Sequence, residues 1–232
     1  MKLVQFAIAL LLPFSASAHS SLAQQVDAFQ AAYGHPTSNF QLLNKSSRIF
    51  ADLEKPKVAL KGVLYWGGAD KAQARSQSAM SNTSTGNFCA EGFSHLYYIY
   101  KKNVGPSQVS CGRGTIPYTV TGQVSPGNSA VRAFMQTIYR IIKADGKVGP
   151  AYLHCWWGVH ASNTFASIAL KQFCGYSDQQ AVAHWDRIGH LPDPNNRALS
   201  AAAKEENRNK IRNFQPYADL QITDAEQRLI CF

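Results

Sequence analysis

One stretch of the chain, residues 151–162, places a thiol, an imidazole and a hydroxyl around a single turn. Ala151 to His154 reads as a short buried strand, Cys155 to Val159 as a tight turn, and a helix begins at about His160. A turn from a strand into a helix aims backbone N–H groups and the positive end of the helix dipole at one point. A cysteine at that point lies in a positive field, which favours the nucleophilic thiolate. The stretch is therefore a candidate anion site with a nucleophile, although a lone cysteine after a strand is more often a core residue.

The stretch resembles the phosphate-binding loop of the protein tyrosine phosphatase superfamily, whose signature is H-C-x5-R followed by Ser or Thr. His154, Cys155, Gly158 and Ser162 match this signature, whereas Ala161 occupies the arginine position. His160 lies one place earlier. The loop itself would consist of Trp156, Trp157, Gly158, Val159 and Ala161. The resemblance is to the small, dual-specificity-like branch and covers roughly residues 58–190.

The resemblance implies a role for each matching residue. Cys155 would attack phosphorus to form a thiophosphate intermediate, His154 would orient the loop, and Ser162 would help the thiolate to leave. Ala161 cannot replace the arginine, whose charge-assisted hydrogen bonds are typically worth about 1.5–3 kcal/mol each. His160 could restore part of the positive charge if protonated, or be a packed or surface residue.

The general acid of the family is also not evident. Residues 92–144, where the acid loop is expected near Thr119 to Val124, contain no Asp or Glu. Without an acid, the leaving alkoxide departs unassisted, which costs a factor of about 10²–10⁴ in rate. Asp52 or Asp193 could act as a substitute from outside the region of resemblance.

Other interpretations of the same residues remain open. Trp156 and Trp157 could form an apolar rim for a bulky ligand or simply pack. Cys155 could pair with a histidine for acyl transfer, although no family signature supports that scheme. The histidines considered are His154, His160, His184 and His190. Redox chemistry at Cys155 would lack the usual C-x-x-C motif.

Composition and the N-terminal segment indicate an exported protein. The chain has 232 residues, 45% of them hydrophobic, enough for one well-cored domain. Residues 1–18 read as a secretory signal with Lys2, an apolar run and the small-residue site Ala16-Ser17-Ala18. We therefore predict a single domain over residues 19–232, in a bacterial periplasm or secreted. No later apolar run reaches the roughly 18 residues of a membrane span.

The charge of the mature chain favours anionic ligands. It carries 22 basic and 14 acidic residues, a net charge of +8. No basic run is interleaved with aromatic residues, so we expect no nucleic-acid partner, and we expect no membrane partner after signal removal. We also expect no metal or other cofactor, because no cysteines show zinc-site spacing.

Five cysteines in an oxidising compartment leave one thiol free or in an intermolecular bond. If Cys155 is the free one, the other four can form two pairs. We favour Cys89–Cys111 and Cys174–Cys231.

Hydrophobic periodicity predicts alternating helices and strands. The predicted helices are 20–33, one within 71–90, 125–146, 161–174, 177–190 and 197–213, and the predicted strands are 61–66, 93–100, 115–120 and 151–154. The order helix, strand, turn and helix around residue 155 favours a parallel sheet. We therefore predict an α/β fold with a central, mostly parallel sheet flanked by helices, similar to the tyrosine and dual-specificity phosphatase fold.

Two functions follow from these residues. One is an exported, phosphatase-like protein that binds phosphate or a phosphorylated ligand, with weak or altered catalysis. The alternative is an active, divergent cysteine-dependent phosphatase acting on phosphomonoesters. A protein partner is left open as a further ligand.

Overall fold

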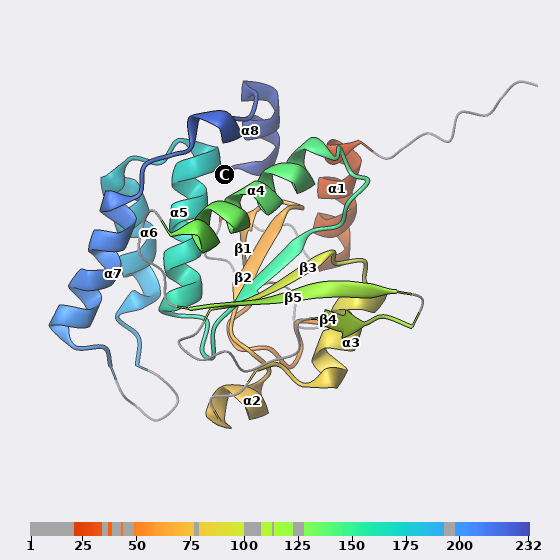
Figure 1. Ribbon diagram of the computed structural model, residues 1–232, viewed down its shortest axis with the longest axis horizontal. Helices are drawn as coiled ribbons and strands as arrows, with labels where there is room; N and C mark the ends of the chain where they lie inside the picture. Colours follow the sequence, from red (N-terminus) through yellow and green to blue (C-terminus); the bar gives the residue numbers. More distant parts are fainter. Residues whose placement is uncertain are drawn as a thin grey trace, which may run out of the picture.

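The computed structural model describes residues 21–33, 37–38, 43, 49–76, 79–99, 108–112, 114–122, 128–192 and 198–232. The predicted signal at 1–18 and the candidate acid Asp193 lie outside these residues. Within them, helices surround a central sheet (Figure 1). The strands are β1 (Lys57–Leu60), β2 (Leu64–Gly67), β3 (His95–Ile99), β4 (Gln108–Ser110), β5 (Thr115–Thr121) and β6 (Ala151–His154). The helices are α1 (Leu22–Tyr33), α2 (Lys71–Ser76), α3 (Asn82–Ala90), α4 (Ser129–Lys143), α5 (Ala161–Cys174), α6 (Asp178–Gly189), α7 (Ala201–Asn213), the 3-10 helix η1 (Ala218–Leu220) and α8 (Asp224–Ile230).

The sheet is mixed and mostly parallel, with the strand order β1-β2-β6-β3-β5-β4. The four inner strands β2, β6, β3 and β5 run parallel, whereas β1 and β4 at the two edges run antiparallel to their neighbours. The predicted fold class is confirmed. Strand β6 lies between β2 and β3, so the loop that follows it lies near the centre of the sheet, at the carboxyl ends of the parallel strands. Ligands commonly bind at this end of such sheets.

Helices cover both faces of the sheet with apolar side chains. On one face, Phe134 of α4 packs against Phe165 of α5, and both belong to one core cluster with Trp66 of β2; Figure 1 shows α4 and α5 on this side. On the other face, Phe88 of α3 packs against Tyr152 of β6. Every residue of α5 from Ser162 to Phe173 is buried. The helix that follows the Cys155 loop is therefore a rigid core element, fixed by its surroundings on all sides.

Short-range signals predicted several helix ends correctly. Ser177 and Gln180 form a capping box at the start of α6, and Gly175 ends α5 in a left-handed conformation with φ of 67°, as the predicted helices 161–174 and 177–190 require. These features depend on residues close together in the chain, so they are readable from the sequence.

Other predicted elements were wrong in part. The single helix predicted within 71–90 is two helices, because Asp70 and Ser81 each accept the first N–H groups of a new helix. The strand predicted at 61–66 is shifted to β2, and residues 61–63 form the turn of a hairpin with β1. Strand β4 was missed altogether. It pairs with β5 along its outer side, so Pro117 faces Gln108 across the ladder.

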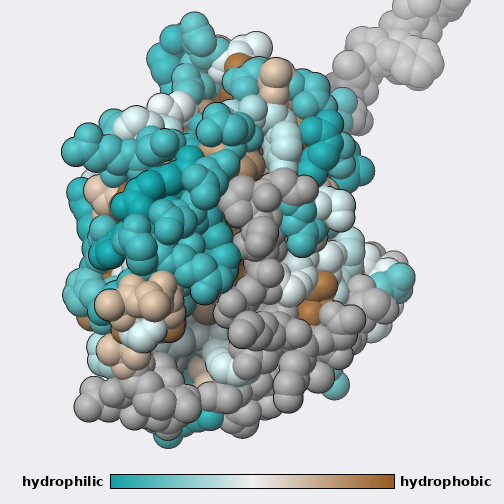
Figure 2. Space-filling view, turned by 60° about the vertical axis from the view of Figure 1, so that its left-hand side comes forward, coloured by the Kyte–Doolittle hydropathy of each residue, from teal (hydrophilic) through white to brown (hydrophobic). Residues whose placement is uncertain are grey.

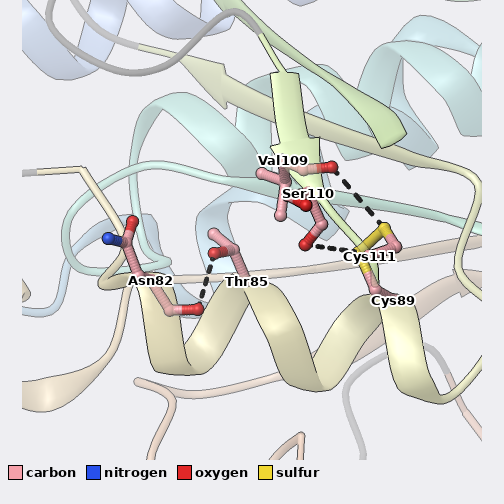
Figure 3. The surroundings of a disulfide bond; sticks show 6 residues. All are labelled: Asn82, Thr85, Cys89, Val109, Ser110 and Cys111. Carbon is pink, nitrogen blue, oxygen red and sulfur yellow. Dashed lines mark hydrogen bonds between the residues drawn. A yellow bond between two sulfur atoms is a disulfide. The ribbon is translucent and has the colours of Figure 1, made fainter. Parts of the chain in front are cut away.

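Two disulfides are present, and they are the pairs favoured from the sequence. Cys89 bonds to Cys111, and Cys174 bonds to Cys231. Figure 3 shows the first bond joining α3 to the segment just after β4, beside Val109 and Ser110. The second ties the end of α5 to the segment after α8. Cys155 is the free cysteine and is buried.

The outer face of α7 is hydrophilic. Arg208 pairs with Asp186 of α6 at 2.9 Å, and Lys210 pairs with Glu206 at 2.7 Å. Figure 2, which brings the side of α7 forward, shows hydrophilic residues over this surface. Across the described ranges, no helix has both the length and the apolar character needed to cross a membrane.

Candidate active site

The Cys155 loop connects β6 to α5 at the carboxyl end of the parallel strands. Cys155 is 7% exposed, and its sulfur has two polar neighbours. The backbone N–H of Gly158 donates to Sγ at 3.2 Å, and Ser162 Oγ lies 3.2 Å from the same atom. Ser162 also donates to the carbonyl of Gly67 at 2.9 Å. Since a hydroxyl has one proton, the thiol donates to Ser162 in this arrangement, and a thiolate would receive the Ser162 proton instead.

Backbone hydrogen bonds join the loop to the end of β2 and the residues after it. The carbonyl of Gly67 accepts the N–H of Cys155 at 3.3 Å, and the N–H of Ala69 donates to the carbonyl of Trp156 at 3.1 Å. Gly158 has φ of +67°, and a Cβ at this position would lie 2.5 Å from the carbonyl carbon of Gly67. Only glycine fits here without a shift of the backbone. The match of Gly158 to the signature is therefore a requirement of the packing between the loop and β2.

His154 lies wholly inside the protein and orients the loop backbone. Its Nε2 lies 2.7 Å from the hydroxyl of Tyr118, and its Nδ1 lies 3.2 Å from the carbonyl of Cys155. A carbonyl only accepts, so Nδ1 carries the proton and Nε2 accepts from Tyr118. The Tyr118 oxygen accepts in turn from the N–H of Met80 at 3.2 Å. Burial lowers the pKa of His154 to about 4, so the ring is neutral near pH 7.

The candidate histidine bases for acyl transfer lie in other hydrogen bonds. His154 uses both ring nitrogens as described above. Nδ1 of His184 bonds to Ser167 at 2.9 Å, and burial lowers the pKa of His184 to about 3. His190 is exposed, and its Nδ1 lies 3.0 Å from the carbonyl of Asp186. These contacts give no support to a thiol–imidazole pair built from His154, His184 or His190.

His160 is the N-cap residue of α5 but makes no side-chain cap hydrogen bond. Its backbone carbonyl accepts from the N–H and the hydroxyl of Thr164, at 2.9 and 3.0 Å, and from the indole of Trp185 at 3.3 Å. Ala161 is half-buried and Val159 is fully buried. The His160 side chain therefore does not cap the first turn of α5, which lies next to the thiol.

The two tryptophans of the loop differ in their surroundings. The half-buried Trp156 donates its indole N–H to the hydroxyl of Tyr98 and packs against the core on the α3 face. Trp157 donates to the carbonyl of Pro192 at 2.8 Å, and the ammonium of Lys55 lies 3.4 Å from its ring centroid. Trp156 thus serves packing, whereas Trp157 forms part of the loop surface beside a cation.

Two aspartates on the segments next to β1 and β2 bear on the missing acid. Asp52 is exposed and lies on the segment before β1. Asp70 follows β2 and is buried, and sequence reasoning missed it. Its two oxygens accept the N–H groups of Gln73 and Ser81, at 3.1 and 2.9 Å. An aspartate directly before a helix is an N-cap signal, and this signal could have predicted its structural role.

Sequence reasoning also missed Lys57, the first residue of β1. Lys57 is 3% exposed. Its Nζ donates to the carbonyl of Lys55 at 2.7 Å and lies 4.7 Å from the ring centroid of Trp66. Burial lowers the pKa of Lys57 to about 7, with the charge of Lys55 as a second cause, while the charge of Cys155 acts in the opposite direction. A lysine directly before the apolar run Val58 to Leu60 was the available signal.

No protein-family model matches the chain, and no curated protein matches it in sequence. Solved structures do match. Tk-PTP in the active form has 10% identity and a TM-score of 0.45, covering 68% of this chain and 95% of that one. A human tyrosine phosphatase-like serine/threonine/tyrosine-interacting protein has 15% identity and a TM-score of 0.39, covering 66% and 93%. P. aeruginosa TpbA in complex with pTyr has 13% identity and a TM-score of 0.39, covering 84% and 96%. At these identities the likeness is one of fold alone.

Proposed function

We propose that this chain is an exported, tyrosine-phosphatase-like protein that binds phosphate or a phosphorylated ligand in the Cys155 loop. In this proposal its catalysis is weak or altered. The observation that carries the proposal is the environment of the free thiol. Cys155 lies at the N-terminus of α5, with the Gly158 N–H and the Ser162 hydroxyl at its sulfur.

The backbone of the loop supplies the anion site. Helix α5 has 14 residues, and the side chain of its N-cap residue does not cap the first turn. The first-turn N–H groups and the helix dipole therefore favour an anion next to Cys155. Gly158 holds the turn in the conformation that brings its N–H to the sulfur. Phosphate, with several acceptor oxygens, suits a set of convergent N–H donors.

Two missing groups argue for slow turnover. Ala161 provides no bidentate clamp for the equatorial oxygens. Both oxygens of Asp70 already accept backbone N–H groups, so this carboxylate is occupied in capping. An oxyanion that develops in the transition state would receive less stabilisation than the signature arginine gives, and the leaving group would lack a proton.

The second candidate is an active, divergent phosphatase. The contact between Ser162 and Cys155 favours it, because a hydroxyl on the sulfur assists a thiolate that must leave. In that reaction Sγ would attack phosphorus and the alcohol oxygen would depart. Water would then attack the thiophosphate and release phosphate and the Cys155 thiolate.

Protection from alkylation tests the proposed binding. Because Cys155 is the free cysteine, iodoacetamide modifies one site, which intact mass spectrometry follows. We expect alkylation at pH 6 to be slowed by phosphate or vanadate but not by chloride at equal ionic strength. Alkylation that proceeds at the same rate with and without these anions would refute an anion site at Cys155.

Hydrolysis of an aryl phosphate separates the two candidates. The purified mature protein is compared with Cys155→Ser, with folding checked by circular dichroism. Activity that disappears in the variant would identify the active phosphatase. Protection by phosphate without measurable hydrolysis would identify the binding protein.

Export is part of the proposal and has its own test. The signal-like segment 1–18 and the two disulfides support it, because disulfides persist in oxidising compartments. We expect the mature protein to begin at His19 when the full chain is expressed in a bacterium. An intact N-terminus on a cytoplasmic protein would refute export.

A further inference from the structure

We infer that Lys57 supplies the cation of the Cys155 loop, from strand β1 rather than from the loop itself. The inference extends the proposed function, since the ligand it would serve is the phosphate proposed above. The effect on the thiol does not depend on that ligand, so the two can be tested separately.

The sheet register places Lys57 next to the loop. Lys57 pairs with Trp66 across the β1–β2 ladder, and Gly67 follows directly. The carbonyl of Gly67 holds both the N–H of Cys155 and the hydroxyl of Ser162. Lys57 therefore lies opposite Trp66, one residue before Gly67, whose carbonyl holds the loop.

The side chain of Lys57 points to the face that carries α5. Residues paired across a ladder lie on the same face of a sheet, and Trp66 belongs to the core on the α5 face. The ammonium lies 4.7 Å from the Trp66 ring centroid, which confirms this direction. Helix α5 packs against β1 and β2, and its first turn carries Ala161. A positive charge at Lys57 thus lies on the side of the sheet from which the signature arginine would emerge.

Among the groups whose charges act on Lys57, the Cys155 thiolate is the one that would stabilise its ammonium. Lys55, on the segment before β1, repels it, and Cys155, from the loop, attracts it. His184 of α6 also faces Lys57, but its lowered pKa keeps it neutral. Within the described part of the chain, no carboxylate pairs with Lys57. A buried ammonium with such surroundings gains most from a thiolate or a bound phosphate.

The ammonium of Lys57 would supply the positive charge that the signature arginine supplies in the family. A proton that moves from Cys155 Sγ to Lys57 Nζ leaves a thiolate and an ammonium with no change in total charge. Burial lowers the pKa of Lys57 to about 7, so its amine can accept a proton near neutral pH. One of the three ammonium donors is used by the carbonyl of Lys55. However, an ammonium is a point charge and cannot clamp two oxygens as a guanidinium does, which agrees with altered catalysis.

The test measures the alkylation rate of Cys155 at pH 6 in variants of position 57. Lys57→Met removes the charge with little change in length. Lys57→Gln removes it but keeps a donor for the Lys55 carbonyl, and Lys57→Arg keeps the charge. The matched control is Lys61→Met, in the turn of the same hairpin. Folding of each variant is checked by thermal unfolding.

We expect roughly tenfold slower alkylation in Lys57→Met and Lys57→Gln, because loss of a nearby positive charge disfavours the thiolate, and rates near wild type in Lys57→Arg and Lys61→Met. Equal rates in all variants would overturn the inference. Protection by phosphate is then measured in the same proteins. If phosphate protects wild type and Lys57→Met equally, Lys57 is not the cation of the site although the proposed function stands. If phosphate protects neither while Lys57→Met still slows alkylation, the proposed function fails and the pairing of Lys57 with Cys155 stands.

Discussion

A neutral side chain at position 57 should stabilise the fold, and the gain should depend on pH. Lys57 is 3% exposed, and its pKa falls from 10.5 to about 7, chiefly because burial disfavours the charged form. A difference of roughly 3.5 pKa units corresponds to about 5 kcal/mol. This is the order of magnitude by which the charged ammonium weakens the folded state. Methionine fills a similar volume without this cost.

The direction of the pH dependence follows from the two pKa values. The unfolded chain keeps the Lys57 proton up to about pH 10.5, whereas the folded chain releases it above about 7. Between these values the unfolded state binds more protons, so wild-type stability rises with pH. Lys57→Met lacks this rise. The advantage of the variant should therefore be largest below pH 7 and should shrink by roughly 2 to 3 kcal/mol by pH 9.

Urea unfolding at pH 6 and pH 9 measures the effect. Both chains carry Cys155→Ser, which prevents thiol–disulfide exchange at alkaline pH. That change also removes a charge that raises the pKa of Lys57, so the expected effect grows. Lys61→Met, at a half-buried position, is the control and should change stability far less. A Lys57→Met variant that is destabilised at pH 6, or equally stabilised at both pH values, would refute a buried charge at this position.

Three further substitutions test the loop. Gly158→Ala should lower the free energy of unfolding by at least about 2 kcal/mol, because its Cβ would meet the backbone of β2 in a left-handed conformation; a thermal melt unchanged from wild type would contradict the packing described. Ala161→Arg should tighten phosphate binding about 10- to 100-fold through charge-assisted hydrogen bonds, measured by protection of Cys155 from alkylation; unchanged protection would mean that the loop does not present an anion site. Tyr118→Phe should cost about 1–3 kcal/mol in urea unfolding at pH 7, because the buried Nε2 of His154 loses its donor; no loss would show that this hydrogen bond does not hold the loop.

Local sequence patterns were sufficient to predict the elements around the Cys155 loop. The apolar strand before Cys155, the glycine in the turn and the apolar helix after it are contiguous, so the strand–loop–helix unit was readable. The stripe that includes Phe134 and Ile138 marked α4, and both residues are fully buried. These signals work because helix and strand periods repeat within a few residues.

Elements that depend on distant partners were missed. Strand β4 has three residues and alternates between exposed and buried positions, too short for a periodic signal. It exists because β5 offers an edge and the Cys89–Cys111 bond holds it next to α3 (Figure 3). The break between α2 and α3 likewise depends on Asp70, whose two oxygens cap one helix and hold the start of the next.

The sequence by itself determined the chemistry that the protein carries: a thiol at Cys155, a hydroxyl at Ser162, an alanine at the arginine position and a deficit of acids between residues 92 and 144. The tertiary structure alone decided how these groups are surrounded. It brought Tyr118 to His154 across the sheet and Lys57 to the edge beside the loop. The physical reason is that strand pairing joins residues far apart in the chain, so burial and electrostatic neighbours are properties of the sheet register and not of local sequence.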